Sequence, residues 1–152
     1  MFDTRTHECP SAEAYFFAKE KHQGQMYGDL PYTFHLHSVA HLVGMMYKKN
    51  PLIETLLSIA YLHDVMEDCG VTYEELVQKF GVCIAEAVKA ITKVEGESYD
   101  GYMAKVIAND LARKVKVCDT MSNLHNSFIS GREKGMAKYP TQLAILHKGN
   151  PL

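Results

Sequence analysis

The stretch LLSIAYLHDVMEDCG, residues 56–70, passes from an apolar segment into one histidine and three carboxylates. Asn50-Pro51 precedes it, and this pair is typical of the N-cap and first position of a helix. Gly70 suits the position just past a helix end, where a left-handed backbone is common. The sequence therefore predicts a helix over about residues 51–69 that is apolar along most of its length and strongly polar in its last turns.

The polar end of this predicted helix carries more negative charge than a helix end favours. In a continuous helix, Glu67 lies one turn beyond His63. Asp68 likewise lies one turn beyond Asp64, so the four side chains would share one broad face. Acids at the C-terminal end oppose the helix macrodipole, and like charges four residues apart repel. A bound metal cation is the simplest compensation, so this segment predicts a metal site.

The rest of the chain repeats apolar residues at helical intervals and shows no sustained period-two alternation. Thr72 to Glu75 fits a capping box, which begins a short helix. Residues 24–31 and 94–98 contain glycine among polar residues, so we expect loops there. The further predicted helices cover about residues 11–27, 33–49, 72–80, 82–93, 99–108, 110–129 and 133–147. The chain is therefore predicted to be one all-α domain, residues 1–152, of seven or eight short helices.

Composition places the chain among ordinary globular proteins. Hydrophobic residues make up 47% and charged residues 22% of its 152 residues, so disorder is not expected. A formal net charge of −2 argues against a nucleic-acid partner. The first residues lack the apolar segment of a signal peptide, and no run reaches the ~18 apolar residues of a membrane span, so no membrane partner is expected. Four cysteines without a CxxC pair favour reduced thiols and a cytoplasmic location.

The proposed metal needs ligands beyond the central segment. Imidazole and carboxylate ligands together suit Mn, Fe, Zn or similar ions. His63 and Asp64 are adjacent, so they reach one ion only at a helix end or with suitable rotamers. His35, at the start of a predicted helix, and Asp119, in an otherwise apolar segment, are candidates for the remaining ligands. The alternatives are a capping or surface role for His35 and an ion pair with a neighbouring Lys or Arg for Asp119.

The order His35, His63-Asp64, Asp119 resembles the H…HD…D signature of the HD-domain metal-dependent phosphohydrolases. The closer likeness is to the (p)ppGpp hydrolase branch, which comprises the hydrolase domains of RelA/SpoT-type proteins and the small stand-alone alarmone hydrolases. The matching stretches follow the family's order and cover about residues 12–126. They are AxxxHxGQ at 18–25, PYxxH at 31–35, LHDxxED at 62–68, TxxEL at 72–76, FG at 80–81, VxxITK at 88–93 and VKxxDxxxNL at 115–124.

This resemblance implies an HD-type helical bundle with one divalent ion, typically Mn²⁺, with Fe, Zn, Co and Ni as alternatives. The implied ligands are His35, His63, Asp64 and Asp119. Glu67 and Asp68 match the acidic pair that positions or activates the attacking water, the alternative being a solvated helix end. Asn123 matches a residue of the substrate site. In such a site the metal lowers the pKa of its bound water, and a carboxylate takes a proton from that water.

The chain departs from the family pattern near the substrate. Alarmone hydrolases usually carry a basic residue soon after the Gly-Gln pair, where this chain has Met26-Tyr27-Gly28. Tyr27 offers an aromatic ring that can stack on a base, but it brings no cation to a phosphate. Small members of the family often have an Arg and a Lys-Tyr pair in a closing helix, which Arg132 and Lys138-Tyr139 resemble. These residues would supply phosphate-facing charge, or else form a solvated basic helix face.

The sequence thus predicts a metal-dependent phosphohydrolase that acts on a nucleotide phosphate or pyrophosphate ester. A (p)ppGpp-like 3′-diphosphate is the first candidate substrate, followed by other nucleotides that include phosphorylated dinucleotide cofactors. One alternative is a nucleotide-binding regulatory module with the HD fold and little hydrolysis, suggested by the missing cation near Tyr27. A purely structural helical protein is the third alternative. The sequence makes no prediction of oligomeric state.

Overall fold

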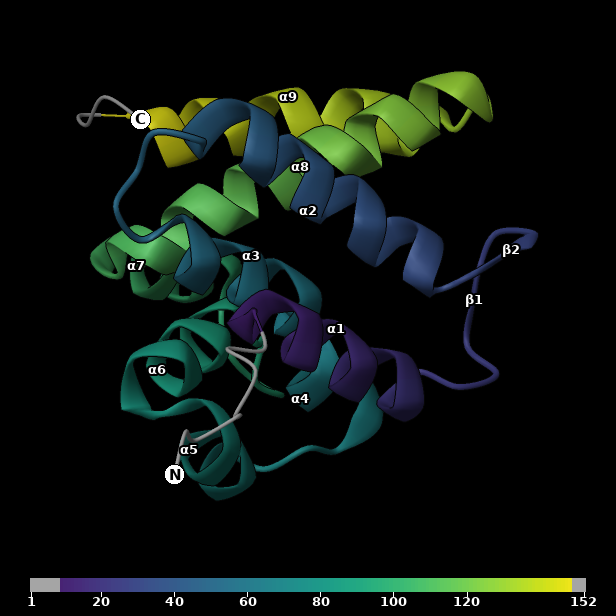
Figure 1. Cartoon of the computed structure of the whole chain (residues 1–152). Coiled ribbons are helices and arrows are strands. Elements are labelled where there is room, and N and C mark those ends of the chain that lie inside the picture. The colour runs from purple at the N-terminus through teal and green to yellow at the C-terminus, as the bar shows by residue number, and fades with distance from the viewer. Residues whose placement is uncertain (1–8, 149–152) are drawn as a thin grey trace, which may run out of the picture.

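The computed structural model describes residues 9–148, and this part of the chain is almost wholly helical (Figure 1). The all-α prediction is therefore confirmed. The expected absence of a signal peptide rests largely on residues 1–8, which lie outside the described range. The elements are α1 (Pro10–Lys21), β1 (Met26–Tyr27), β2 (Leu30–Pro31), α2 (Thr33–Tyr47), α3 (Ile53–Leu62), α4 (Val65–Cys69), α5 (Tyr73–Phe80), α6 (Val82–Ile91), α7 (Tyr99–Ala108), α8 (Asp110–Ile129) and α9 (Glu133–His147).

The predicted central helix is divided, so residues 9–148 contain nine helices where seven or eight were expected for the whole chain. His63 is the C-cap residue that follows α3, and Asp64, with φ −108° and ψ 0°, lies in the turn between α3 and α4. The single broad face predicted for residues 63–68 is therefore wrong. Because α4 starts at Val65, Glu67 and Asp68 lie in its first turn, where acids suit the helix dipole. The predicted charge penalty is correspondingly smaller.

One of the two predicted ends of the central segment agrees with the structure. Gly70 adopts φ 68° and ends α4, as predicted. At the other end α3 begins at Ile53, two residues later than the Asn50-Pro51 pair indicated. Asn50 is therefore not the N-cap of α3; its Oδ1 accepts a hydrogen bond from the Leu52 N–H at 2.9 Å in the turn that precedes the helix. Thr72 caps α5 as predicted, because its Oγ1 accepts a hydrogen bond from the backbone N–H at position 75 at 3.2 Å. The Glu75 side chain instead lies 3.5 Å from Lys21 Nζ, so the Thr72 half of the predicted capping box is the half that is observed.

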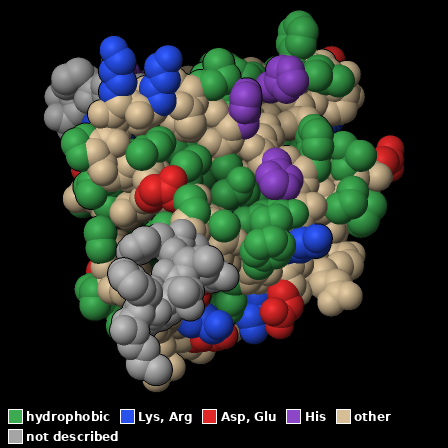
Figure 2. Space-filling model, viewed as in Figure 1, with side chains coloured by type: hydrophobic (Ala, Val, Ile, Leu, Met, Phe, Trp, Pro, Cys, Tyr) green, Lys and Arg blue, Asp and Glu red, His purple; other side chains and the backbone are tan. Residues whose placement is uncertain are grey.

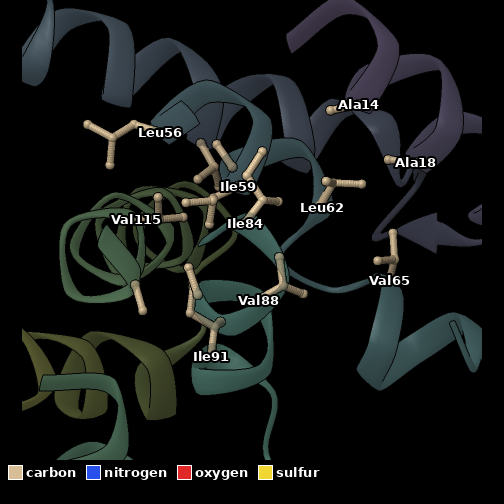
Figure 3. Packing of buried hydrophobic residues seen from close by; sticks show 14 of the residues in the cluster. Ala14, Ala18, Leu56, Ile59, Leu62, Val65, Ile84, Val88, Ile91 and Val115 are labelled. Carbon is tan, nitrogen blue, oxygen red and sulfur yellow. The ribbon is translucent and has the colours of Figure 1, made fainter. Parts of the chain in front are cut away.

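Helix α3 lies at the centre of the hydrophobic core (Figure 3). Leu56, Ile59 and Leu62 on α3 are fully buried. They pack among apolar residues of α6 and α8, while α1 covers the other side of α3. Full burial of one such side chain stabilises the fold by about 1.5–3 kcal/mol. The apolar half of the segment 56–70 thus anchors α3, and this places the polar residues at its end beside α2 and α8.

Helices α8 and α9 run alongside each other at the C-terminal end of the described chain (Figure 1). A second apolar cluster joins them to α7, with Tyr102, Val117 and Leu146 among its buried members. The two helices approach closely at Gly135, where a Cβ atom would lie 2.1 Å from Ser127 Oγ. No larger residue fits at this position without movement of α9. The close contact sets how α9 lies over the residues of α7 and α8.

A short antiparallel hairpin interrupts the helical pattern between α1 and α2. Helix α1 ends at Lys21 rather than near residue 27, and β1 pairs with β2 through Met26 opposite Pro31 and Tyr27 opposite Leu30. Gly28, at φ 58°, allows the tight turn between the strands. Period-two alternation cannot reveal strands of two residues, so the sequence indicated only a loop here. The hairpin projects from the helical body in Figure 1.

The face shown in Figure 2 mixes apolar, charged and histidine side chains, and charges of both signs are scattered over it. Between residues 9 and 148, no helix combines the length and the apolar character that crossing a membrane requires.

Candidate active site

The four predicted metal ligands come together from three parts of the chain. His35 lies in the first turn of α2, His63 at the end of α3, Asp64 between α3 and α4, and Asp119 in the middle of α8. His35 Nε2 lies 2.9 Å from Asp119 Oδ1. His63 Nε2 lies 3.0 Å from Asp64 Oδ2 and 3.4 Å from Asp119 Oδ1. Both imidazoles are buried, at 2% and 1% exposed.

The break between α3 and α4 is what lets adjacent residues face one site. In a continuous helix, neighbouring side chains point about 100° apart. Here His63 closes α3, and Asp64 begins a new backbone direction. One atom each of His35, His63 and Asp64 lie within 4.8 Å of one another. The sequence had left two ways for adjacent ligands to meet, and the helix end is the one that the structure adopts.

The chemistry of these side chains fits a divalent metal ion. His63 Nδ1 donates to the Ala60 carbonyl at 2.7 Å, which leaves the Nε2 lone pair facing the site. This Nε2 is fully buried and has no hydrogen-bond partner, although Asp64 Oδ2 is close to it. A buried polar atom without a partner costs about 1–3 kcal/mol. An ion held by two imidazoles and two carboxylates would satisfy it, and such mixed ligands suit Mn, Fe or Zn.

Without the metal, opposite charges hold the site in its ionised form. Burial by itself would lower the pKa of His63, but the carboxylates of Asp64 and Asp119 raise it well above 6.5. Burial would likewise raise the pKa of Asp64, and the charge of His63 instead lowers it to about 2. The imidazolium thus occupies electrostatically the place that a cation would take.

Asp119 contacts a second cation through its other oxygen. Lys116 Nζ donates to Asp119 Oδ2 at 2.7 Å, one turn earlier on α8. Burial would lower the pKa of Lys116, but Asp119 raises it above 10.5, so the ammonium stays charged. Burial would raise the pKa of Asp119, and Lys116 and the histidines hold it well below 3.8. The two interpretations of Asp119 from the sequence are therefore compatible, because one oxygen pairs with Lys116 while the other faces the imidazoles.

Tyr32 is a site residue to which the sequence assigned no role. Its hydroxyl donates to Asp64 Oδ2 at 2.5 Å. Burial, followed by the charge of Asp64, raises the pKa of Tyr32 far above 10.0, so the hydroxyl remains a donor. Tyr32 precedes α2 and lies three residues before His35. Its place in the quoted PYxxH stretch was a signal, but which carboxylate it would bind depended on the tertiary fold.

The two predicted substrate-binding residues lie next to the metal ligands. Tyr27, on β1, stacks on the ring of His35 with 4.7 Å between ring centroids and a 12° interplanar angle. Its hydroxyl donates to Asn123 Oδ1 at 2.6 Å. Asn123 Nδ2 in turn donates to Asp119 Oδ1 at 3.1 Å. The hairpin therefore reaches the site through Tyr27, and Asn123 joins it to α8.

The acidic pair on α4 divides between two neighbouring segments. Glu67 Oε1 accepts a hydrogen bond from the Lys93 backbone N–H at 2.8 Å, in the loop after α6. Asp68 Oδ2 accepts from Gln25 Nε2 at 3.0 Å, just before the hairpin. Both acidic side chains are exposed. They therefore flank the site on two sides rather than forming one acidic cluster.

A small basic cavity lies between α4, α7, α8 and α9. Its volume is about 170 Å³, and the charged side chains on its wall are Glu67, Lys93, Lys116 and Lys138, with Tyr99, Tyr102 and Gln142 completing it. Of the predicted basic tail, Lys138 thus faces this cavity. Arg132 is instead exposed at the start of α9, where its Nε donates to Ser130 Oγ at 3.4 Å. Lys93 and Lys116 joined this group only through the tertiary fold.

Comparison with known proteins shows similarity to one group of enzymes. The chain is 32% identical over 131 residues to the guanosine-3′,5′-bis(diphosphate) 3′-pyrophosphohydrolase of Aquifex aeolicus, which covers 80% of the chain and 18% of that protein. It is 31% identical over 119 residues to the Danio rerio 3′-pyrophosphohydrolase MESH1, covering 72% of the chain and 64% of that protein. The chain thus spans less than two thirds of the length of either relative.

A solved structure shares the fold. It belongs to a metazoan orthologue of SpoT described as hydrolysing ppGpp, and it matches with a TM-score of 0.73 at 21% identity over 93% of this chain and 87% of that one. No protein-family model matches the chain. Sequence and fold together confirm the resemblance to the RelA/SpoT-type hydrolases that the motifs indicated.

Proposed function

We propose that this chain, a RelA/SpoT-type hydrolase by resemblance, is a metal-dependent phosphohydrolase that acts on a nucleotide carrying a phosphate or pyrophosphate ester. The convergence of His35, Asp64 and Asp119 around the buried Nε2 of His63 carries this proposal. The names of the relatives make a (p)ppGpp-like 3′-diphosphate the first candidate substrate.

These four residues would hold one divalent ion, for which we expect Mn²⁺. The ion supplies a bound water of lowered pKa and polarises a phosphoryl oxygen. The protein's own groups prepare the ligands. Ala60 fixes the tautomer of His63 through Nδ1, and the Tyr32 hydroxyl orients the Asp64 carboxylate. Lys116 keeps Asp119 ionised, so all four ligands present lone pairs once His63 has lost its proton.

Glu67 and Asp68 are proposed to act on the attacking water. Both are exposed carboxylates one turn beyond the ligand Asp64, and each has one oxygen held by a hydrogen bond from a neighbouring segment. A carboxylate held in this way can orient a water and accept its proton as the phosphoryl bond forms. The other oxygen of each side chain remains available for that contact.

The basic cavity supports a substrate with a second phosphate group. Lys93, Lys116 and Lys138 line this space of about 170 Å³. Lys116 also contacts the ligand Asp119, so the cavity adjoins the metal centre. We propose that one phosphate group reacts at the metal while another lies among these lysines. They would supply positive charge to that second phosphate group.

Metal analysis of the purified protein followed by a nucleotide panel tests this function. We expect metal-dependent release of phosphate or pyrophosphate from at least one nucleotide. His63→Ala and Asp64→Ala should abolish it, while His41→Ala, which removes an exposed histidine from α2, serves as the matched control. Equal turnover by the wild type and both ligand variants would refute the proposal.

A regulatory nucleotide-binding module is the second candidate. One observation favours it: Tyr27 occupies the place of the expected cation, and its hydroxyl is engaged by Asn123. Tight nucleotide binding without turnover, across several divalent metals, would support this alternative. Multiple turnover would exclude it.

A further inference from the structure

The side chain of Gln25 connects a buried histidine to one of the proposed water-binding acids. Gln25 lies between the end of α1 and the start of β1. Its Nε2 donates to Asp68 Oδ2 at 3.0 Å, and its Oε1 lies 2.7 Å from His22 Nδ1. Both ends of the amide are therefore engaged.

Chemistry determines which way the amide points. An ionised carboxylate only accepts hydrogen bonds, so the Gln25 NH₂ group must face Asp68. The Gln25 oxygen then faces His22, whose Nδ1 must carry the proton that it donates. The reverse orientation would place the amide oxygen against the carboxylate oxygen. The arrangement is thus directional, running from His22 through Gln25 to Asp68.

His22 is a firm anchor for this arrangement. It is 3% exposed and stacks on Tyr32, with 4.6 Å between ring centroids and a 28° interplanar angle. Its backbone N–H donates to the Ala18 carbonyl at 2.9 Å, which ties it to the last turn of α1. Cys69 Sγ lies 3.3 Å from its Nδ1. Stacking on Tyr32 and the contacts of Nδ1 with Gln25 and Cys69 therefore hold the ring in place.

The backbone of Gln25 is also held. Its N–H donates to the His22 carbonyl at 2.9 Å, and its carbonyl accepts from the Tyr32 N–H at 2.9 Å. This second bond closes the base of the hairpin. Tyr32 on the opposite side of that base donates to Asp64. One rigid base thus contacts a metal ligand through Tyr32 and an exposed acid through Gln25.

We propose that Gln25 is a positioning residue that sets the orientation of Asp68, with His22 as its anchor. The inference rests on the proposed function, in which Asp68 acts on the attacking water. The Asp68 side chain is exposed, and its hydrogen bond from Gln25 holds the carboxylate in one orientation, turned toward the base of the hairpin. Small errors in the placement of a catalytic group cost rate rather than binding. Gln25 therefore acts through Asp68 and does not itself touch the substrate.

Gln25→Met tests this role. Methionine keeps the length of the side chain and the backbone hydrogen bonds, but it removes both the NH₂ donor and the C=O acceptor of the amide. We expect kcat to fall about 10- to 100-fold, as for other groups that support site residues. KM and metal affinity should stay unchanged. Gln25→Ala is the second variant, and Gln23→Ala, which truncates an exposed glutamine two residues earlier, is the matched control. A change in KM or metal affinity with kcat retained would overturn the proposal.

A double-mutant cycle separates positioning from general structural damage. In an Asp68→Asn background, Gln25→Met should cause little further loss of kcat, because the group it orients is already disabled. If the losses of kcat in the two single variants multiply in the double variant, Gln25 does not act through Asp68 and the positioning role is overturned. The proposed function fails separately, since it falls if the metal-loaded wild type turns over no nucleotide. An active wild type with multiplying losses removes the inference about Gln25 alone.

Discussion

At the scale of single residues, His63 is the group in the site that either a proton or a metal ion would occupy. His63 is buried between two carboxylates, and its other nitrogen is held by the Ala60 carbonyl. The same negative charge that would bind a cation also retains a proton on the imidazole. A bound metal would therefore compete with this proton for Nε2 of His63.

This competition predicts the pH dependence of metal binding. Burial would lower the pKa of His63, but Asp64 and Asp119 raise it well above 6.5, so the metal-free site holds a proton near neutral pH. Metal must displace this proton, and its apparent affinity should rise with pH until the raised pKa is passed. Calorimetric titration with Mn²⁺ in buffers of different ionisation enthalpy should detect the released proton. An affinity that does not change with pH across neutrality would contradict the assignment.

At the scale of elements, the break between α3 and α4 creates the site. Burial of the apolar face holds α3 in place. The chain then turns at Asp64 and makes one short helix that ends at Gly70. The Val71 N–H closes this unit by donating to the Val65 carbonyl at 3.2 Å. Such a short helix depends on its ends, since its few internal hydrogen bonds cannot hold it alone.

Gly70→Ala tests this dependence. Gly70 adopts φ 68°, a conformation that costs an alanine about 1–2 kcal/mol. We expect a loss of unfolding free energy of that size, measured by urea denaturation. Gly44→Ala is the matched control, because Gly44 lies inside α2 with open space around its Cα, and alanine there should stabilise by roughly 0.5–1 kcal/mol. A Gly70→Ala protein as stable as the wild type would contradict this account of α4.

At the scale of the whole molecule, α9 completes one wall of the site. It packs along α8, close enough at Gly135 to exclude any side chain there. This contact brings Lys138 to the cavity that Lys93 and Lys116 reach from other segments. Three lysines from three parts of the chain meet only because α9 folds back over α7 and α8.

Lys138→Met should therefore weaken the binding of nucleotides that carry a second phosphate group more than the binding of nucleotides that carry one. Loss of one charge-assisted contact predicts a roughly tenfold rise in KM for the doubly phosphorylated substrate, with metal affinity unchanged. Lys134→Met is the control, since Lys134 is exposed on the same helix and does not line the cavity. An equal effect on both classes of nucleotide would argue against a phosphate in this cavity.

Local signals predicted most of the helices because their physical basis is local. The Thr72 cap, Gly70 and the periodic apolar residues of α6 and α8 each act within a few residues of the chain. The residues His35, His63, Asp64 and Asp119 were also proposed from the sequence. That proposal depended on resemblance, because spacing alone favoured a capping or surface role for His35 and an ion pair for Asp119.

The sequence by itself determined the helical class and the apolar face that buries α3, and its resemblance to a known family supplied the four candidate ligands. Only the tertiary structure decided that the central helix breaks at Asp64, that Tyr32 binds Asp64 and that Gln25 binds Asp68. It also decided that Lys93, Lys116 and Lys138 share one cavity. The physical reason is the separation along the chain over which each interaction acts. Helix propensity and capping act between neighbours, whereas these contacts join residues far apart in the chain, and only packing of the helices sets where they meet.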